Sequence, residues 1–296
     1  MTTTHAQVIT APDQRTVTFL FPTQTTPVLR GDGKEIPSSS GTHGAHGTYH
    51  PHGSSVQSIC AVSERDGYRL YTGSRDSCTN VFQLRRGRRD YQHVASLQGH
   101  VDWVNDVVAL GDGGDGIVGT CSSDGTCRVW GADGGLRTCL AGHGDYVTGL
   151  ASALVRPRLW SCGLGKLGGE VFGWDVEEGR RCVSFAGVEL GQSAYCVASL
   201  GGIASFSDCV CVGLSGRERN VVVLDGRSEE MVCRLMGHEG TVRRAVVGGG
   251  MVYTGGGDGL IKGWDLRYVQ EGVGGHHPVH TIRCHGTWLL CHAVSC

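Results

Sequence analysis

Short apolar runs separated by Gly- and Asp-containing breaks occupy most of this chain. Four such runs follow one another at residues 101–108, 117–121, 126–130 and 136–140. Runs of this length with partial period-2 alternation predict β-strands joined by hairpins. Asp124-Gly125 and Asp258-Gly259 predict tight turns, because glycine adopts a positive φ without strain. No stretch of helical period is longer than about a dozen residues, so we expect an all-β chain.

One spacing of polar and aromatic residues occurs twice in the first half of the chain. The residues are His52, Ser74, Asp76 and Phe82 in the first copy, and His100, Ser122, Asp124 and Trp130 in the second. In both copies the Asp lies 24 residues after the His, and the aromatic residue lies 6 residues after the Asp. A fixed spacing of this kind is the sequence sign of a repeat protein.

The aromatic position and a Gly-His dipeptide recur along the chain. The aromatic position falls at Phe82, Trp130, Trp174, Leu224 and Trp264, and the dipeptide at Gly99-His100, Gly142-His143 and Gly237-His238. A degenerate fourth repeat is expected to start near residues 193–197. A period in the forties with a Gly-His start and a Trp-Asp end is typical of a WD40 β-propeller, in which four strands form one blade. The sequence therefore predicts about five recognisable blades plus the start of a sixth.

The repeats also suggest how the chain is divided. We expect repeats at about 52–97, 98–140, 141–190, 191–235 and 236–283, with a partial repeat at 284–296. Residues 1–15 are predicted to be disordered, and residues 30–55 form a Gly-, Ser- and His-rich loop. Between them, residues 16–21 are a predicted strand. In propellers the N-terminal strand commonly closes the ring as the outer strand of the last blade, and we expect this role here.

Composition narrows the possible partners and compartments. The formal net charge is −2, so we expect no polyanion partner for the whole domain. The 14 cysteines include no CxxC pair and many lie in strand-like runs, which predicts reduced, buried thiols in the cytoplasm or nucleus. The first residues lack the apolar core of a signal peptide. No apolar run reaches about 18 residues, so we expect no membrane span.

Two interpretations of the recurring His, Ser and Asp compete. A catalytic triad would use His100 as base, Ser122 as nucleophile and Asp124 to orient the base. The repetition favours a structural role instead, as a buried hydrogen-bond chain within each blade. The predicted structural residues are His52, Ser74, Asp76, His100, Ser122, Asp124, Trp130, His143, Trp174, His238, Asp258 and Trp264. Gly256 stands at the Ser position of the fifth repeat, so we expect that blade to be looser.

Two clusters have the composition of ligand sites. The histidines are His43, His46, His50 and His52, with a second group at His276, His277 and His280. Clustered His can bind zinc, but no Cys or acidic residue joins them at ligand spacing, so we expect loops and no metal. The basic run at residues 85–89 could contact phosphates, although a solvated loop is the simpler interpretation. We expect no cofactor, no small-molecule substrate and no catalytic activity.

Several strings go beyond a generic WD repeat. They are Leu70-Tyr71-Thr72-Gly73-Ser74-Arg75-Asp76-Ser77, His100-Val101-Asp102-Trp103-Val104-Asn105-Asp106, Cys121-Ser122-Ser123-Asp124-Gly125-Thr126, His143-Gly144-Asp145-Tyr146-Val147-Thr148 and Gly168-Gly169-Glu170-Val171-Phe172-Gly173-Trp174-Asp175. Together they resemble the WD-repeat-48 family of propeller cofactors, especially its plant or algal members, over about residues 55–270. Family members have a longer propeller and C-terminal ubiquitin-like domains, so we expect this chain to be truncated within its sixth blade.

The resemblance implies a non-catalytic scaffold that binds and activates a ubiquitin-specific protease. On a propeller, residues just after the Gly-His turn face the top surface, and aromatic and Arg side chains are the usual anchors of an interface. These positions are Trp103, Tyr146, Tyr195, Arg243 and Trp288. Similar family positions contact the protease in later blades, which favours Arg243 and Trp288. Trp103 and Tyr146 could instead pack between blades. The alternative function is a WD40 adaptor of another complex, such as a ubiquitin-ligase substrate receptor.

Overall fold

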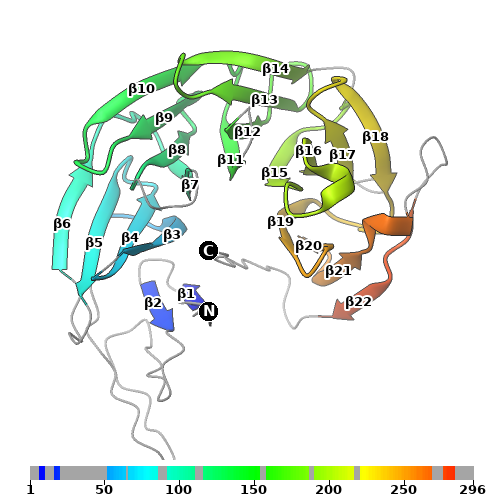
Figure 1. Ribbon diagram of the computed structural model, residues 1–296, viewed down its shortest axis with the longest axis horizontal. Coiled ribbons are helices and arrows are strands. Elements are labelled where there is room, and N and C mark those ends of the chain that lie inside the picture. Colours follow the sequence, from blue (N-terminus) through cyan, green and yellow to red (C-terminus); the bar gives the residue numbers. More distant parts are fainter. Residues whose placement is uncertain are drawn as a thin grey trace, which may run out of the picture. The chain divides into compact units, whose positions relative to one another are not determined.

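The computed structural model consists mainly of five four-stranded sheets (Figure 1). It describes residues 7–10, 17–20, 52–64, 66–85, 92–110, 116–153, 158–186, 190–216, 221–268 and 276–283. The chain divides into two compact units, one with the first sheet and most of the second, the other with the third to fifth sheets and residues 125–128 and 138–141 of the second repeat. In every sheet, strands that are consecutive in the chain are also neighbours in space.

The first unit is built on two sheets. The first sheet contains β3 (Val56–Glu64), β4 (Gly67–Ser74), β5 (Thr79–Arg85) and β6 (Gln92–Leu97). The second contains β7 (Val104–Ala109), β8 (Val118–Ser122), β9 (Thr126–Trp130) and β10 (Leu136–Ala141). The first strand of the second sheet, β7, packs on β3 and β4 of the first.

The second unit continues the same plan over three sheets. The third contains β11 (Val147–Ser152), β12 (Leu159–Gly163), β13 (Glu170–Asp175) and β14 (Arg180–Ala186). The fourth contains β15 (Ala194–Ser199), β16 (Cys209–Leu214), β17 (Val221–Asp225) and β18 (Glu230–Leu235), with the 3-10 turn η2 (Ala204–Phe206). The fifth contains β19 (Val242–Gly248), β20 (Met251–Gly256), β21 (Leu260–Trp264) and β22 (His280–Arg283), with η3 (Leu266–Tyr268).

This all-β arrangement confirms the predicted fold class, a WD40 propeller with five blades. The degenerate fourth repeat begins its first strand at Ala194, inside the predicted range. The two predicted hairpin glycines have positive φ, 81° at Gly125 and 73° at Gly259. A residue with a Cβ is strained in this region, which explains why glycine follows Asp at both turns.

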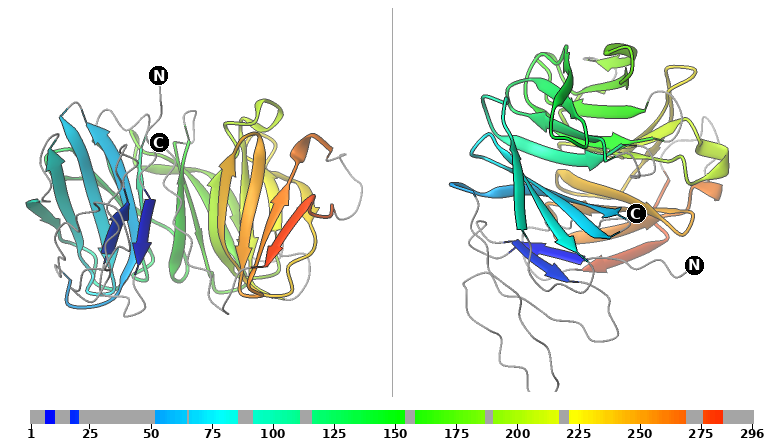
Figure 2. Two further views of the ribbon diagram at one scale, coloured as in Figure 1. Left: turned by 90° about the horizontal axis from the view of Figure 1, so that it is seen from below. Right: turned by 60° about the vertical axis from the view of Figure 1, so that its left-hand side comes forward.

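Consecutive blades pack in the same way within the second unit. The first strand of each sheet contacts the first and second strands of the sheet before it, so that β15 lies on β11 and β12, and β19 lies on β15 and β16. Figure 2 shows the fourth and fifth sheets in two further views. Burial of the apolar faces between successive sheets is the main source of stability in such a repeat.

A β-bulge recurs near the start of every first strand. The register shifts lie between Val56 and Ser58, Val104 and Asp106, Val147 and Gly149, Ala194 and Cys196, and Val242 and Arg244. A bulge inserts one residue and redirects its side chain. In each blade, one residue of the first strand therefore does not follow the alternation of side chains between the two faces of the sheet.

The N-terminal segment differs from expectation in one respect. A strand, β1 (Gln7–Thr10), lies within the segment that we predicted to be disordered. It pairs antiparallel with β2 (Val17–Leu20), so the strand predicted at 16–21 has a local partner in the described chain. The outer strand of the fifth sheet is β22, which pairs with β21. The ring-closing role expected for residues 16–21 in the last blade stays a prediction. The β-branched residues of Gln7–Thr10 and Val17–Leu20 favour this hairpin. The partial repeat at 284–296 lies outside the described residues.

Candidate functional site

A chain of hydrogen bonds crosses the second sheet from its third strand to its edge. The Trp130 Nε1–H group donates to Thr120 Oγ1 at 2.9 Å, and Thr120 Oγ1 lies 2.9 Å from His100 Nε2. His100 Nδ1 lies 2.8 Å from the Asp124 carboxylate. A carboxylate only accepts, so the proton of the contact with Asp124 belongs to His100 Nδ1, and in this tautomer Nε2 accepts from the Thr120 hydroxyl. His100 is then the tautomer that donates from Nδ1 to Asp124.

The fifth sheet repeats this chain without loss. Trp264 Nε1 donates to Thr254 Oγ1 at 2.8 Å, Thr254 Oγ1 lies 2.8 Å from His238 Nε2, and His238 Nδ1 lies 2.9 Å from Asp258. Gly256, at the Ser position of this repeat, therefore does not interrupt the hydrogen-bond chain. The hydroxyl comes from Thr254, two residues earlier in the same strand.

The predicted serines have another role. Ser122 Oγ donates to the Asp102 carbonyl at 3.0 Å and accepts the Asp124 N–H at 3.0 Å. Ser74 makes the equivalent contacts with the Ser54 carbonyl at 3.3 Å and the Asp76 N–H at 3.2 Å. Both serines brace the edge of a sheet and do not belong to the chain from Trp to Asp.

This geometry also excludes the triad of His100, Ser122 and Asp124. Ser122 is completely buried, and its hydroxyl proton is committed to a backbone carbonyl. A nucleophile must reach its substrate and pass its proton to the base. The His100 Nε2 atom that would serve as base contacts Thr120 instead.

The residues that sequence reasoning missed are the hydroxyl groups of the chains. They are Thr72, Thr120, Ser161 and Thr254, one in each of the first, second, third and fifth sheets. Each lies two residues before the end of the second strand. A Ser or Thr recurring at this position was the available signal, and the predicted serines two residues later obscured it.

The third sheet keeps the chain with a different acid. Trp174 Nε1 donates to Ser161 Oγ at 2.7 Å, and Ser161 Oγ lies 2.6 Å from His143 Nε2. Glu170, after a longer turn, places its carboxylate 3.1 Å from His143 Nδ1. Burial, and secondarily the charge of Arg181, lower the pKa of His143 to about 3. His143 is therefore neutral in the folded protein.

The first sheet keeps the His and the acid but lacks the indole. His52 Nδ1 lies 2.8 Å from Asp76, and His52 Nε2 lies 2.8 Å from Thr72 Oγ1. Phe82 occupies the Trp position and packs edge-on against His93, with ring centroids 5.4 Å apart. The aromatic bulk is retained at this position, while the hydrogen-bond donor is not.

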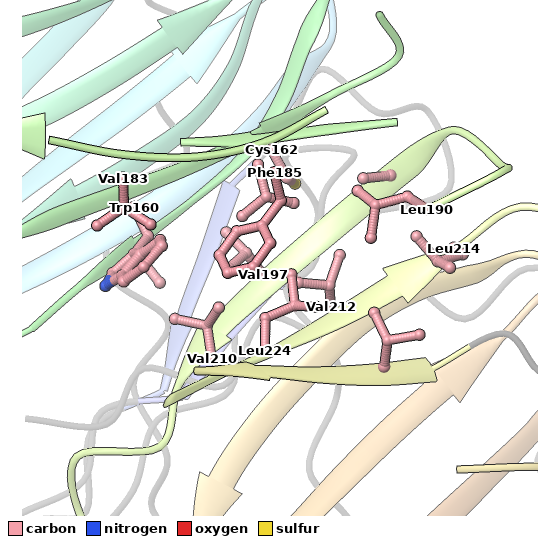
Figure 3. Packing of buried hydrophobic residues seen from close by; sticks show 14 of the residues in the cluster. Trp160, Cys162, Val183, Phe185, Leu190, Val197, Val210, Val212, Leu214 and Leu224 are labelled. Carbon is pink, nitrogen blue, oxygen red and sulfur yellow. The ribbon is translucent and has the colours of Figure 1, made fainter. Parts of the chain in front are cut away.

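The fourth sheet replaces the imidazole, the hydroxyl and the indole of the chain by apolar side chains. Leu190, Val212 and Leu224 stand at the His, Thr and Trp positions and are 3%, 0% and 1% exposed. They belong to one cluster with Phe185 and Trp160 of the third sheet (Figure 3). Replacing all partners together leaves no buried polar group unsatisfied, so this substitution is compatible with a stable blade.

In the four polar sheets the acid also anchors the loop before the first strand. The carboxylates of Asp76, Asp124, Glu170 and Asp258 accept the N–H of the residue after the His, at distances of 2.9, 3.2, 2.9 and 3.0 Å. This bond holds the loop against the turn between the second and third strands. We call the end of a sheet where this loop and this turn meet the His edge.

The predicted partner-binding residues Trp103 and Tyr146 lie at the His edge. Their side chains are 44% and 48% exposed, so neither is buried between blades. Each lies one residue before a first strand. Their backbone N–H groups donate to Asp102 at 2.7 Å and to Asp145 at 2.8 Å. The backbone that presents these two aromatic rings is therefore fixed locally.

The guanidinium of Arg75 stacks over the ring of Trp103 in the first unit. Its Cζ atom lies 4.2 Å from the ring centroid, and Arg75 comes from the turn between β4 and β5 of the neighbouring sheet. A cation over an indole face is a favourable contact. Val101, also at this edge, is 83% exposed. The first unit thus presents an exposed apolar surface beside a positive charge.

Tyr195 and Arg243 also pair, but from a different register position. They are the bulge residues of β15 and β19, and the Arg243 Cζ atom lies 5.6 Å from the Tyr195 ring centroid. Both side chains are half-buried. The sequence grouped them with Trp103 and Tyr146, whereas the structure separates the four residues into two classes. Trp288 lies outside the described residues.

Other candidate sites receive no support from the described residues. That part of the chain holds no group of three His, Cys, Asp or Glu side chains arranged to bind a metal. His43, His46, His50 and residues 86–89 of the basic run lie outside it. None of the helices described is long and apolar enough to cross a membrane.

Comparison with protein families identifies one repeat directly. The family described as "WD domain, G-beta repeat" matches residues 91–131. The match covers β6 of the first sheet and continues through β9 of the second. It therefore contains His100, Thr120, Asp124 and Trp130, the complete hydrogen-bond chain of the second blade. A WD40 repeat is thus present, within a WD-repeat propeller.

Proposed function

We propose that this chain is a non-catalytic scaffold that binds and activates a ubiquitin-specific protease through the His edge of its blades. The observation that carries the proposal is the exposure of Trp103 and Tyr146 on backbone held rigid by buried hydrogen-bond chains. WD-repeat propellers typically bind proteins, and exposed aromatic residues on rigid backbone are the side chains that anchor such interfaces.

The resemblance to the WD-repeat-48 family supports the choice of partner. Its two most specific strings, residues 100–106 and 143–148, contain Trp103 and Tyr146 and lie at the His edge. Family-like sequence and exposed interface chemistry therefore coincide.

Activation would follow from selective binding. A scaffold shifts a protease toward its active conformation only by binding that conformation more tightly. A tenfold preference corresponds to about 1.4 kcal/mol, which one well-packed aromatic anchor can supply. The chain itself then needs no catalytic group.

The test is hydrolysis of ubiquitin conjugates by ubiquitin-specific protease catalytic domains, with and without the purified chain. Two double variants probe the two classes of residue, Trp103→Ala/Tyr146→Ala and Arg243→Ala/Trp288→Ala. Leu136→Ala is the matched control, because Leu136 is 49% exposed on an outer strand away from the His edge. We expect stimulation that at least one double variant abolishes and the control retains.

A folded chain that neither binds nor stimulates any of these proteases would refute the proposal. Retention of full stimulation by both double variants would refute the assignment to the His edge. A WD40 adaptor of another complex, such as a ubiquitin-ligase substrate receptor, would then become the leading alternative.

A further inference from the structure

The turn between β12 and β13 in the third sheet is longer than its counterparts. It spans residues 164–169, whereas the corresponding turns of the second and fifth sheets span residues 123–125 and 257–259. The hydrogen-bond chain of the third sheet takes its acid from Glu170, at the start of β13. That chain is complete without a side chain from the turn, so the extra length of the turn has another role.

Both ends of this turn are fixed to neighbouring backbone. The Leu164 N–H donates to the Tyr146 carbonyl at 3.0 Å, and the Gly169 N–H donates to the Gln192 carbonyl at 2.8 Å. Leu167, near the tip of the turn, is nevertheless 83% exposed. A side chain on backbone that is already ordered loses less conformational freedom when a partner covers it.

The second sheet has an equally exposed aliphatic residue at its His edge. It is Val101, which follows His100, lies two residues before Trp103 and is also 83% exposed. The N–H of Val101 donates to the acid of its own blade, as the N–H of Gly144 does in the third sheet. Gly144 therefore stands at the Val101 position and provides no side chain beside Tyr146.

The long turn lies against Gly144. A Cβ atom at Gly144 would lie 3.1 Å from Glu170 Oε1, 3.4 Å from Lys166 Cγ and 3.6 Å from Lys166 N. Lys166 thus adjoins the position from which Val101 extends in the second sheet, and Leu167 is the next residue of the turn. Each of these two His edges therefore presents one exposed aliphatic residue and one exposed aromatic residue, although the aliphatic residue comes from a different element.

We propose that Leu167 forms, with Tyr146, an apolar contact for the protease, in the way that Val101 accompanies Trp103. The proposal rests on the function proposed above and adds the chemistry of the contact, a protease surface that is apolar and accommodates a branched aliphatic side chain. Neither side chain carries a charge, so the contact slows dissociation and leaves the association rate nearly unchanged. Burial of a Leu side chain makes binding roughly tenfold tighter or more.

Biolayer interferometry with a ubiquitin-specific protease catalytic domain that the wild-type chain stimulates tests this contact. Leu167→Ser should raise Kd about tenfold or more through faster dissociation, whereas Leu167→Met should keep most of the affinity because it retains an apolar side chain of similar volume. Leu136→Ser is the matched control, because Leu136 is 49% exposed on β10, and its Kd should equal that of the wild type. All three positions changed are exposed, so thermal melting followed by circular dichroism should not differ among the variants.

The outcomes separate this contact from the proposed function. An unchanged Kd for Leu167→Ser, with a wild-type chain that stimulates the protease, would overturn the contact and leave the proposed function intact. A folded wild-type chain that binds no ubiquitin-specific protease would overturn both. Equal losses in Leu167→Ser and Leu167→Met would contradict an apolar contact. A wild-type dimer in analytical ultracentrifugation that Leu167→Ser converts to monomers would identify a second copy as the occupant and also overturn the proposal.

Discussion

The strongest quantitative prediction concerns the hydrogen-bond chain of the fifth sheet. Thr254 and Trp264 are each 1% exposed, and Thr254 Oγ1 contacts both Trp264 Nε1 and His238 Nε2 at 2.8 Å. Thr254→Val keeps the shape of the side chain and removes both contacts. Each buried group left without a partner costs about 1–3 kcal/mol, so the substitution should destabilise the protein by roughly 2–6 kcal/mol.

A double-mutant cycle with Trp264→Phe isolates one of these bonds. Phenylalanine has no N–H group, and the first sheet already carries Phe82 at this position. In the Trp264→Phe background, Thr254→Val removes only the hydroxyl contact of His238 Nε2. The double variant should therefore be more stable than the sum of the single effects predicts, by about 1–3 kcal/mol.

Urea denaturation followed by far-ultraviolet circular dichroism measures the four stabilities without relying on the fluorescence of the altered indole. Thr79→Val is the matched control. Thr79 is 1% exposed, and its hydroxyl lacks a hydrogen-bond partner in the described structure. The same substitution there removes no hydrogen bond, so it should not destabilise the protein and should raise its stability by up to about 1–3 kcal/mol, because it removes an unpartnered buried hydroxyl. Additivity of Thr254→Val and Trp264→Phe within about 0.5 kcal/mol would refute the proposed chain.

Three further predictions follow from individual side chains. The pKa of His143 is lowered to about 3 in the folded state, against about 6.5 in the unfolded state. The contribution of neutral His143 to the free energy of unfolding is therefore fully present above pH 6.5 and is lost as the pH falls toward 3. The loss at pH 5 should be about 2 kcal/mol, and His143→Asn should reduce the difference in unfolding free energy between pH 7 and pH 5 by that amount. Ser122→Ala should destabilise the protein by about 1–3 kcal/mol in urea denaturation without changing protease stimulation; loss of function in a folded variant would contradict its purely structural role. Burial raises the pKa of the Cys211 thiol well above 9, so iodoacetamide mapped by mass spectrometry should label exposed Cys139 first; equal labelling at native pH would contradict the assigned burial.

The sequence predicted the fold and most of the His, Asp and Trp members of the hydrogen-bond chains, but it did not predict their hydroxyl groups. His and Asp were identified because turn glycines and a spacing of 24 residues mark them in the first two repeats. The hydroxyl was misplaced because Thr120 and Ser122, two residues apart in one strand, point to the same face. Only the pairing register of the strand shows which of the two hydroxyl groups reaches the His ring. Val104 pairs with Ser122 at the end of the strand, which leaves Thr120 one step deeper, at the His100 ring.

One sequence was also not enough to predict the blades in which other residue types replace members of the hydrogen-bond chain. The fourth blade shows no His, Thr or Trp to count, and its stability depends on Leu190, Val212 and Leu224 filling one apolar cluster. The third blade takes its acid from Glu170 after a longer turn, so a search at fixed spacing misses it. In the fourth blade the structure requires only that the buried volume is filled, and in the third only that a carboxylate reaches His143. Several sequences can satisfy either requirement.

The bulge position shows why the predicted interface residues form two classes. In the second and third blades it holds Asn105, which donates to Ser123 Oγ at 3.0 Å, and Thr148, which donates to the Ala194 carbonyl at 2.8 Å. There the bulge residue ties neighbouring segments together, and the residue before the strand presents an exposed ring. In the fourth and fifth blades the bulge itself holds Tyr195 and Arg243. Because a bulge redirects one side chain without disturbing the ladder beyond it, the same backbone device can serve internal bonding or partner contact. Substitutions at Trp103 and Tyr146 should therefore be tested separately from those at Tyr195 and Arg243, since the two classes present their side chains from different backbone positions.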